Sequence, residues 1–212
     1  MSTPNTGAVK QPESFAFTPE NLATAKKIMA KYPEDRQGSA VMPLLDLAQR
    51  QHDNWLPRVA IDYVADMIGM PRIRAYEVAT FYTMYNLAPI GRHMIEVCTT
   101  TPCWLRGSDG IVAACEKRLG VHVGETTADG QFTLREAECL GACVNAPMVQ
   151  ILDDYYEDLT PESMVAIIDT LAKGGKPKPG PQNSRKTSEP EGGPTTLIES
   201  AKRAGIQPAK QG

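Results

Sequence analysis

Two short stretches organise this chain: Cys98-Thr-Thr-Thr-Pro-Cys103, a C-x4-C pair, and Cys139-Leu-Gly-Ala-Cys143, a C-x3-C pair. Together they contain four of the five cysteines. Each pair follows a short apolar run that is typical of a β-strand, so we expect both pairs on loops at strand ends. Four thiolates that converge from two loops suit a soft-metal centre. We interpret them as ligands of one [2Fe-2S] cluster.

Other cysteine chemistries fit the spacing less well. The plant ferredoxin pattern needs a further cysteine where the chain has Arg106, and a Rieske centre needs two histidine ligands. None of His52, His93 and His122 is interleaved with the pairs. Disulfides are disfavoured in reducing compartments, and a thioredoxin-type C-x2-C motif is absent. A structural zinc site stays open, although these spacings stand at the wide end of its range.

The residues beside the cysteines suit a negatively charged cluster. Such a charge is costly to bury unless hydrogen-bond donors point at it. The threonines at 99–101 offer hydroxyl donors, and Gly107 and Gly141 allow backbone conformations that bring amides close to sulfur. Ordinary turn formation is the alternative explanation for the same residues.

Composition limits the classes of function. The 212 residues are 42% apolar and 22% charged, with a formal net charge of −3. A nucleic-acid-binding protein would show a basic face, so we expect no nucleic-acid partner. No apolar run reaches the length of a membrane span, so we expect no direct membrane insertion. The first residues lack the arginine-rich character of a transit peptide, which favours a cytoplasmic bacterial protein or one that has already been processed.

The first part of the chain predicts a helical bundle. Residues 1–16 are polar and are expected to form a flexible N-terminal arm. Residues 17–80 predict four helices with short connections, beginning at Thr18-Pro19, at Ser39 as a cap, near Pro57 and at Pro71. This helical domain contains no residues that suggest chemistry.

Residues 81–173 predict a mixed α/β domain. Ser108 is expected to cap a helix that ends near Leu119, with Cys115 buried in its apolar face and not a fifth ligand. Thr160-Pro161 opens a last helix. The expected strands are 81–85, 93–97, 132–136 and a hairpin formed by 147–152 and 155–158.

Residues 174–212 form a tail rich in proline, glycine and lysine. Such a composition cannot bury enough apolar surface to fold alone, which favours disorder. The alternative is an arm that lies on a partner subunit, anchored by Leu197-Ile198 and Ile206.

The cysteine stretches resemble a known family. The matching segments are Cys98-Thr-Thr-Thr-Pro-Cys103-Trp-Leu-Arg-Gly-Ser, Glu138-Cys139-Leu-Gly-Ala-Cys143-Val-Asn-Ala-Pro-Met and Asp153-Asp-Tyr-Tyr-Glu-Asp-Leu-Thr. They resemble the small [2Fe-2S] subunit of respiratory complex I, over about residues 17–173. The resemblance implies an α+β chain, in which an N-terminal helical bundle precedes a thioredoxin-like [2Fe-2S] ferredoxin domain and an extended C-terminal tail. It also implies that Cys98, Cys103, Cys139 and Cys143 are the cluster ligands.

The resemblance implies an electron-transfer subunit of NADH:quinone oxidoreductase. FMN and NADH are then expected on a flavoprotein partner, with the large iron-sulfur subunit as a second partner. The chain has no G-x-G-x-x-G loop, so we expect no complete active site in this chain alone. The expected location is the cytoplasmic side of the bacterial inner membrane, as a peripheral part of the complex. The alternatives are the corresponding subunit of an NAD-dependent formate dehydrogenase or bidirectional hydrogenase, or a structural zinc-binding adaptor.

Overall fold

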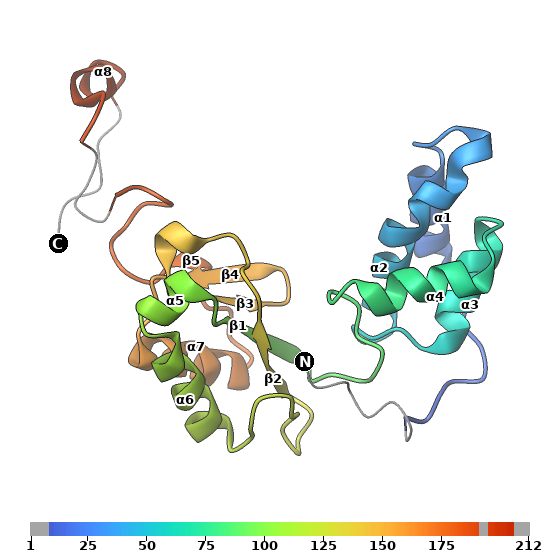
Figure 1. Ribbon diagram of the computed structural model, residues 1–212, viewed down its shortest axis with the longest axis horizontal. Coiled ribbons are helices and arrows are strands. Elements are labelled where there is room, and N and C mark those ends of the chain that lie inside the picture. Colours follow the sequence, from blue (N-terminus) through green and yellow to red (C-terminus); the bar gives the residue numbers. More distant parts are fainter. Residues whose placement is uncertain (1–8, 191–194, 206–212) are drawn as a thin grey trace. The chain divides into compact units, whose positions relative to one another are not determined.

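A computed structural model describes residues 9–190 and 195–205 of the chain (Figure 1). It contains two compact units, and the chain passes from one to the other between Arg92 and His93. This division falls later along the chain than the expected boundary between residues 80 and 81. Residues 82–92 stay with the first unit because Tyr85 and Asn86 are buried in it. The described part of the chain contains no helix both long and apolar enough to cross a membrane.

The first unit is helical. Thr18 caps its first helix, because the Thr18 side-chain oxygen accepts a hydrogen bond from the Asn21 N–H at 3.2 Å and Pro19 takes the first helical position. Predictions of four helices near Thr18, Ser39, Pro57 and Pro71 are confirmed. Their observed bounds are α1 Pro19–Met29, a 3₁₀ segment η2 Glu34–Ala40, α2 Val41–Gln51, α3 Arg58–Met67 and α4 Arg72–Phe81.

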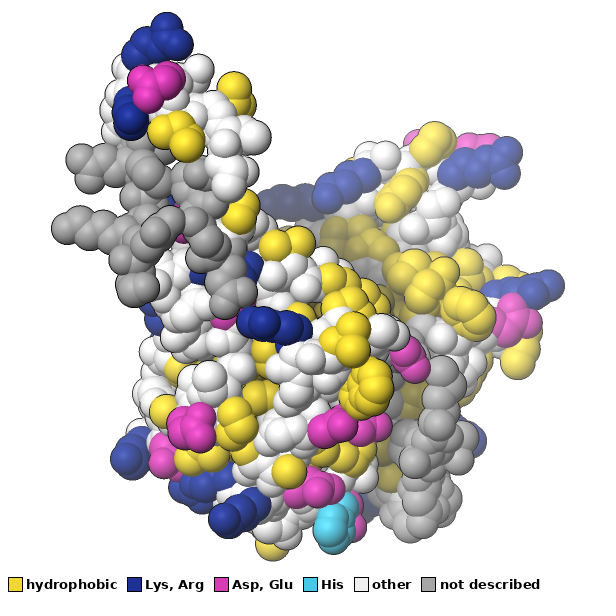
Figure 2. Space-filling model, turned by 60° about the vertical axis from the view of Figure 1, so that its left-hand side comes forward, with side chains coloured by type: hydrophobic (Ala, Val, Ile, Leu, Met, Phe, Trp, Pro, Cys, Tyr) yellow, Lys and Arg dark blue, Asp and Glu magenta, His cyan; other side chains and the backbone are white. Residues whose placement is uncertain are grey.

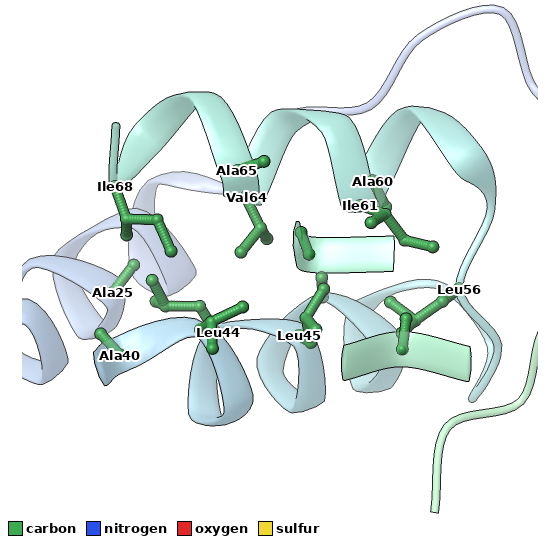
Figure 3. Packing of buried hydrophobic residues seen from close by; sticks show 14 of the residues in the cluster. Ala25, Ala40, Leu44, Leu45, Leu56, Ala60, Ile61, Val64, Ala65 and Ile68 are labelled. Atoms are coloured by element: carbon green, nitrogen blue, oxygen red, sulfur yellow. The ribbon is translucent and has the colours of Figure 1, made fainter. Parts of the chain in front are cut away.

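The core of this unit consists of leucine, isoleucine, valine and alanine side chains at helical spacing. Figure 3 shows side chains of α3 pointing toward those of α2, with Ala25 of α1 beside them. Burying a leucine or isoleucine side chain stabilises a fold by about 1.5–3 kcal/mol. The fully buried members include Leu44, Leu45, Leu56, Ile61 and Val64.

Two local predictions for this unit are wrong. Ser39 does not cap α2, since it lies inside η2 and Ala40 precedes α2 without a side-chain cap. Residues 81–85 are not a strand, because Phe81 ends α4 and the chain then turns. Tyr85 alone of the aromatics in this segment is buried, and its hydroxyl donates to the Met42 carbonyl at 2.9 Å.

The expected N-terminal arm is partly held against the helical unit. The Phe15 ring packs edge-on against Phe17 and Tyr63, with centroids 5.6 Å from each. The Gln51 side-chain amide donates to the Ala16 carbonyl at 2.8 Å. Within the described residues, the segment just before α1 is therefore anchored, and residues 1–8 lie outside them.

The second unit is built on one mixed sheet with the order β2-β1-β3-β4-β5. Strand β1 is parallel to β2, with Cys98 opposite Ala137, and antiparallel to β3, with Val97 opposite Val149. Strand β4 is antiparallel to β3 and parallel to β5. The strands are β1 His93–Cys98, β2 Phe132–Ala137, β3 Val149–Ile151, β4 Asp154–Glu157 and β5 Gly180–Pro181, which confirms the predicted strands at 93–97 and 132–136 and the hairpin.

Two long helices pack on one face of this sheet (Figure 1). They are α6 Ser108–Leu119 and α7 Pro161–Ala172, both close to the predicted ranges. Side chains of α6, α7 and alternate strand positions share one apolar cluster, in which Ile95 and Val97 face the helices. Gly107, in the left-handed conformation, precedes α6 where Ser108 was expected to be the cap. The Ser108 hydroxyl is buried without a hydrogen-bond partner.

Within the described residues, parts of the tail have regular structure that its composition does not predict. Residues 180–181 form β5 beside β4, and residues up to 190 continue from it. A short helix, α8 Ile198–Arg203, follows, with Leu197 exposed at its start. Ile206 lies outside the described residues.

Figure 2 shows basic and acidic side chains interspersed over the face it draws, in keeping with the small net charge.

Candidate metal centre at two cysteine pairs

The first cysteine pair lies where β1 passes into a short helix. Cys98 ends β1, and its N–H donates to the Met148 carbonyl at 3.2 Å. Cys103 lies in the short helix α5 Thr101–Leu105, so the prediction that this residue lies on a loop is wrong. Both cysteines are buried, with exposed fractions of 2% and 1%. The main chain of regular secondary structure therefore fixes this pair.

The second pair lies on an irregular loop after β2. Cys139 and Cys143 are exposed, and their Sγ atoms are 3.4 Å apart. Gly141, between them, has a φ of +88°, a conformation that a side chain rarely adopts. Cys143 begins a 3₁₀ turn, η3 Cys143–Asn145. This loop provides two thiols on one side, close enough to bind the same metal ion.

The two pairs meet at the end of the sheet. The backbone N–H of Leu140, in the second stretch, donates to the sulfur of Cys98 in the first. Leu140, Ala142 and Tyr155 also pack against a small apolar cluster that contains Cys98, Cys103 and Met148. The Tyr155 hydroxyl donates to the Leu140 carbonyl at 2.8 Å. The structure thus brings all four predicted site residues into one region.

Hydrogen bonds give the buried thiols different acidities. Burial raises the pKa of Cys98, but donation from the Leu140 and Thr100 N–H groups and from the Cys103 thiol brings it below its ordinary value. Burial raises the pKa of Cys103 to about 12, helped by its hydrogen bond to Cys98. The contact with Cys139 raises the pKa of Cys143. Cys98 is therefore the buried thiol prepared to carry negative charge.

The fifth cysteine is separate from this region. Cys115 has no exposed surface and packs in the apolar cluster between α6 and the sheet. Burial raises its pKa to about 12, so it stays a neutral thiol at physiological pH. The expectation that it is a core residue agrees with this placement.

The donor set fits a binuclear cluster. Four thiols are arranged as two pairs, and [2Fe-2S] clusters are held by four cysteine thiolates, two on each iron. The Cys98 thiol donates to the Thr100 hydroxyl oxygen at 3.9 Å, and once Cys98 is a thiolate this hydroxyl can donate to it, as the Leu140 amide does.

Exposed apolar side chains surround the pairs, and the sequence pattern did not predict them. Trp104 and Leu105 follow Cys103 and are 56% and 70% exposed, and Val144 follows Cys143 and is 64% exposed. Only the structure shows which side of α5 and η3 is open. From the amino-acid sequence alone, burial of these three side chains is as readily predicted as their exposure.

Comparisons with known proteins identify a family. The family model of thioredoxin-like [2Fe-2S] ferredoxins matches residues 25–172. An NADH-quinone oxidoreductase subunit of Rickettsia bellii is 63% identical over 158 residues, covering 74% of this chain and 95% of that protein. The mitochondrial NADH dehydrogenase [ubiquinone] flavoprotein 2 of Dictyostelium discoideum is 54% identical over 185 residues, covering 87% of this chain and 75% of that protein.

A solved structure supports the fold. An NAD⁺-reducing [NiFe]-hydrogenase in the H₂-reduced state superposes with a TM-score of 0.54 at 20% identity. The match covers 64% of this chain and 23% of the hydrogenase chain. At this identity the likeness concerns the fold alone.

Proposed function

Because this chain belongs to the thioredoxin-like [2Fe-2S] ferredoxin family, we propose that Cys98, Cys103, Cys139 and Cys143 bind one [2Fe-2S] cluster in it. We further propose that the chain is the electron-transfer subunit of an NADH-quinone oxidoreductase. The observation that carries the proposal is the meeting of the two cysteine pairs, where Leu140 and Ala142 of the second stretch pack against the cluster that contains Cys98 and Cys103. A cluster bound there supplies reversible one-electron transfer without breaking covalent bonds.

The protein residues have three tasks in this function. Cys98 and Cys103 provide two thiols from a buried, rigid corner, and Cys139 and Cys143 provide two from the surface. The amide of Leu140 stabilises thiolate charge at Cys98, which lowers the cost of burying it. The exposed pair leaves one side of the site open, so electrons need not cross the whole domain.

The hydride chemistry is assigned to a partner. Throughout the 212 residues there is no G-x-G-x-x-G or other nucleotide-binding loop. We place FMN and NADH on a flavoprotein subunit and a further contact on the large iron-sulfur subunit of the same complex. The relatives named as oxidoreductase subunits support a multi-subunit assembly. We propose that the assembly holds this chain on the cytoplasmic side of the bacterial inner membrane.

The formate dehydrogenase and hydrogenase alternatives rank below this assignment. The likeness to the hydrogenase rests on 20% identity, whereas the oxidoreductase relatives are 54–63% identical over most of this chain. The zinc adaptor ranks lower still, since the thiols form two pairs and the matching family carries [2Fe-2S] clusters.

Anaerobic purification tests the proposal. We expect two irons and two acid-labile sulfides per chain and an EPR signal on reduction. Cys139→Ser should abolish or alter that signal, whereas Cys115→Ala, at the one cysteine outside the pairs, should leave it unchanged. One zinc per chain without iron would contradict the cluster, and an unaltered signal in Cys139→Ser would contradict the ligand assignment.

A further inference from the structure

Part of the tail returns to the cysteine region and forms a strap, defined here as residues 180–189. Its first two residues pair with the end of β4, with Tyr156 opposite Gly180 and Glu157 opposite Pro181 (Figure 1). The Gln182 N–H then donates to the Glu157 carbonyl at 2.9 Å. These contacts start the strap beside the residue that follows β4, which is Asp158.

The strap carries a buried ion pair. The Arg185 guanidinium lies 3.2 Å from the Asp158 carboxylate, and the side chains are only 6% and 3% exposed. Charges so far from water are stable only when each is paired and hydrogen-bonded. Arg185 thus has a fixed position on the second unit, although it lies in a polar, proline-rich stretch.

The same groups hold the turn that follows Cys143. Arg185 also donates to the Val144 carbonyl at 2.8 Å. The Asn145 side-chain amide donates to Asp158 at 3.0 Å and to the Thr187 carbonyl at 2.8 Å. Asn145 is buried, and its carbonyl accepts from the Asp158 N–H at 2.8 Å. The turn η3 therefore has polar contacts both to Asp158, the residue after β4, and to the strap.

We propose that Arg185 is a positioning residue for the metal centre, holding η3 so that Cys143 presents its thiol beside Cys139. Cys143 is exposed and lies at the start of a single 3₁₀ turn, so its own secondary structure fixes it weakly. The bridge from Asp158 through Arg185 to the Val144 carbonyl supplies the missing constraint one residue away. The inference rests on the proposed function, specifically on Cys143 as a ligand.

Iron release from the cluster-loaded full chain tests the inference. Residues that orient metal ligands typically change metal affinity by 10–100-fold, so Arg185→Met should release iron to a chelator about tenfold faster than the unaltered chain. It should also shift or broaden the EPR signal of the reduced cluster. Lys186→Gln is the matched control, because it removes one positive charge from the next residue, whose side chain is exposed. Unaltered release and EPR in Arg185→Met would overturn the inference.

A second variant separates positioning from stability. Arg185→Met leaves Asp158 as an unpaired buried charge, which can unfold the domain by itself. The double variant Arg185→Met with Asp158→Asn removes both charges, so we expect its melting temperature to return toward that of the unaltered chain while iron release stays fast. Iron release at the unaltered rate in a folded double variant would overturn the inference.

A ligand variant identifies which proposal fails. Cys143→Ala should lose iron or change the EPR signal. If it does so while Arg185→Met and the double variant behave like the unaltered chain, the strap inference fails and the ligand assignment stands. If Cys143→Ala keeps the unaltered iron content and EPR signal, the ligand assignment fails, and the positioning inference fails with it.

Discussion

The two cysteine pairs are held in place by different means. Cys98 and Cys103 are buried in a strand end and a helix, and main-chain hydrogen bonds such as Cys98 N–H to Met148 carbonyl fix them. Cys139 and Cys143 are exposed on a loop. Side chains from other segments fix that loop.

The side chains that hold the second pair come from distant parts of the chain. Tyr155 of β4 binds the Leu140 carbonyl, and Arg185 of the strap binds the Val144 carbonyl. A main-chain ladder tolerates most substitutions, whereas a side-chain tether is lost with a single one. Substitutions away from the cysteines should therefore act on the site mainly through the second pair.

Thiol alkylation would show the largest contrast between the pairs. In the chelator-treated full chain, Cys98 and Cys103 should react at least about 100-fold more slowly than Cys139, because reaction requires a local opening that costs about 3 kcal/mol or more. Peptide mass spectrometry after timed iodoacetamide treatment measures each rate. The low pKa of Cys98 makes this test strict, since an accessible Cys98 would react fast.

The control for alkylation is the same measurement in concentrated urea. All five cysteines should then react at similar rates, because unfolding removes the protection. Equal rates for Cys98 and Cys139 without urea would show that the first pair is not held by its secondary structure.

Cys115 is buried but lies outside the two cysteine pairs, so it shows how burial alone changes the pKa of a thiol. Burial raises its pKa from 9.0 to about 12, so the folded state keeps a proton that the unfolded state loses above pH 9. The unfolding free energy must then fall as the pH rises between 9 and about 12. The contribution of Cys115 should be lower by about 1.4 kcal/mol at pH 10 than at neutral pH.

Melting curves of the cluster-loaded chain measure this contribution, because ligand thiols bound to metal are already deprotonated. Between pH 8 and 10, the apparent melting temperature should fall about 3–5 °C further in the unaltered chain than in Cys115→Ala. Tyrosines with raised pKa values, such as Tyr85, contribute equally to both chains. Parallel curves would show that Cys115 is not buried as a neutral thiol.

The sequence predicted the strands that precede both pairs, but it did not predict the helix that contains Cys103. Strand β1 was predicted up to Cys98, because an apolar run with β-branched residues precedes it. Helix α5 was missed because three threonines and a proline are typical of a turn, yet Thr100 and Pro102 occupy the start of a helix. The spacing of the four cysteines and the family resemblance predicted that they lie close together.

The strap could not be predicted from composition. Its composition is typical of a disordered tail. The feature that sets it apart from such a tail is the buried side chain of Arg185. The partner of that arginine, Asp158, follows β4 and is unremarkable in the sequence. Long-range pairing of single polar residues leaves no periodic pattern, which also explains why the anchoring of residues 180–189 was missed.

The prediction of a strand at 81–85 failed for a related reason. Aromatic residues favour strands, and this segment contains three of them. Phe81 and Tyr82 are instead exposed at the end of α4. Tyr85 is buried, and its hydroxyl donates a hydrogen bond to the Met42 carbonyl. Tertiary contacts of one residue overrode the local propensity of the others.

The smallest predicted effect isolates one tether of the second pair. Tyr155→Phe removes the hydroxyl that binds the Leu140 carbonyl, and a hydrogen bond of this kind contributes about 1 kcal/mol. Tyr156→Phe is the matched control, since that side chain lies in the apolar cluster beneath the helices, away from the cysteines. Leu140 also donates its N–H to Cys98. A less firmly held Leu140 should therefore change the EPR signal of the reduced cluster in Tyr155→Phe, whereas Tyr156→Phe should leave the signal unchanged. Identical signals in the two variants would mean that the main chain of the loop suffices to hold Leu140, and the contrast between the pairs would then rest on Arg185.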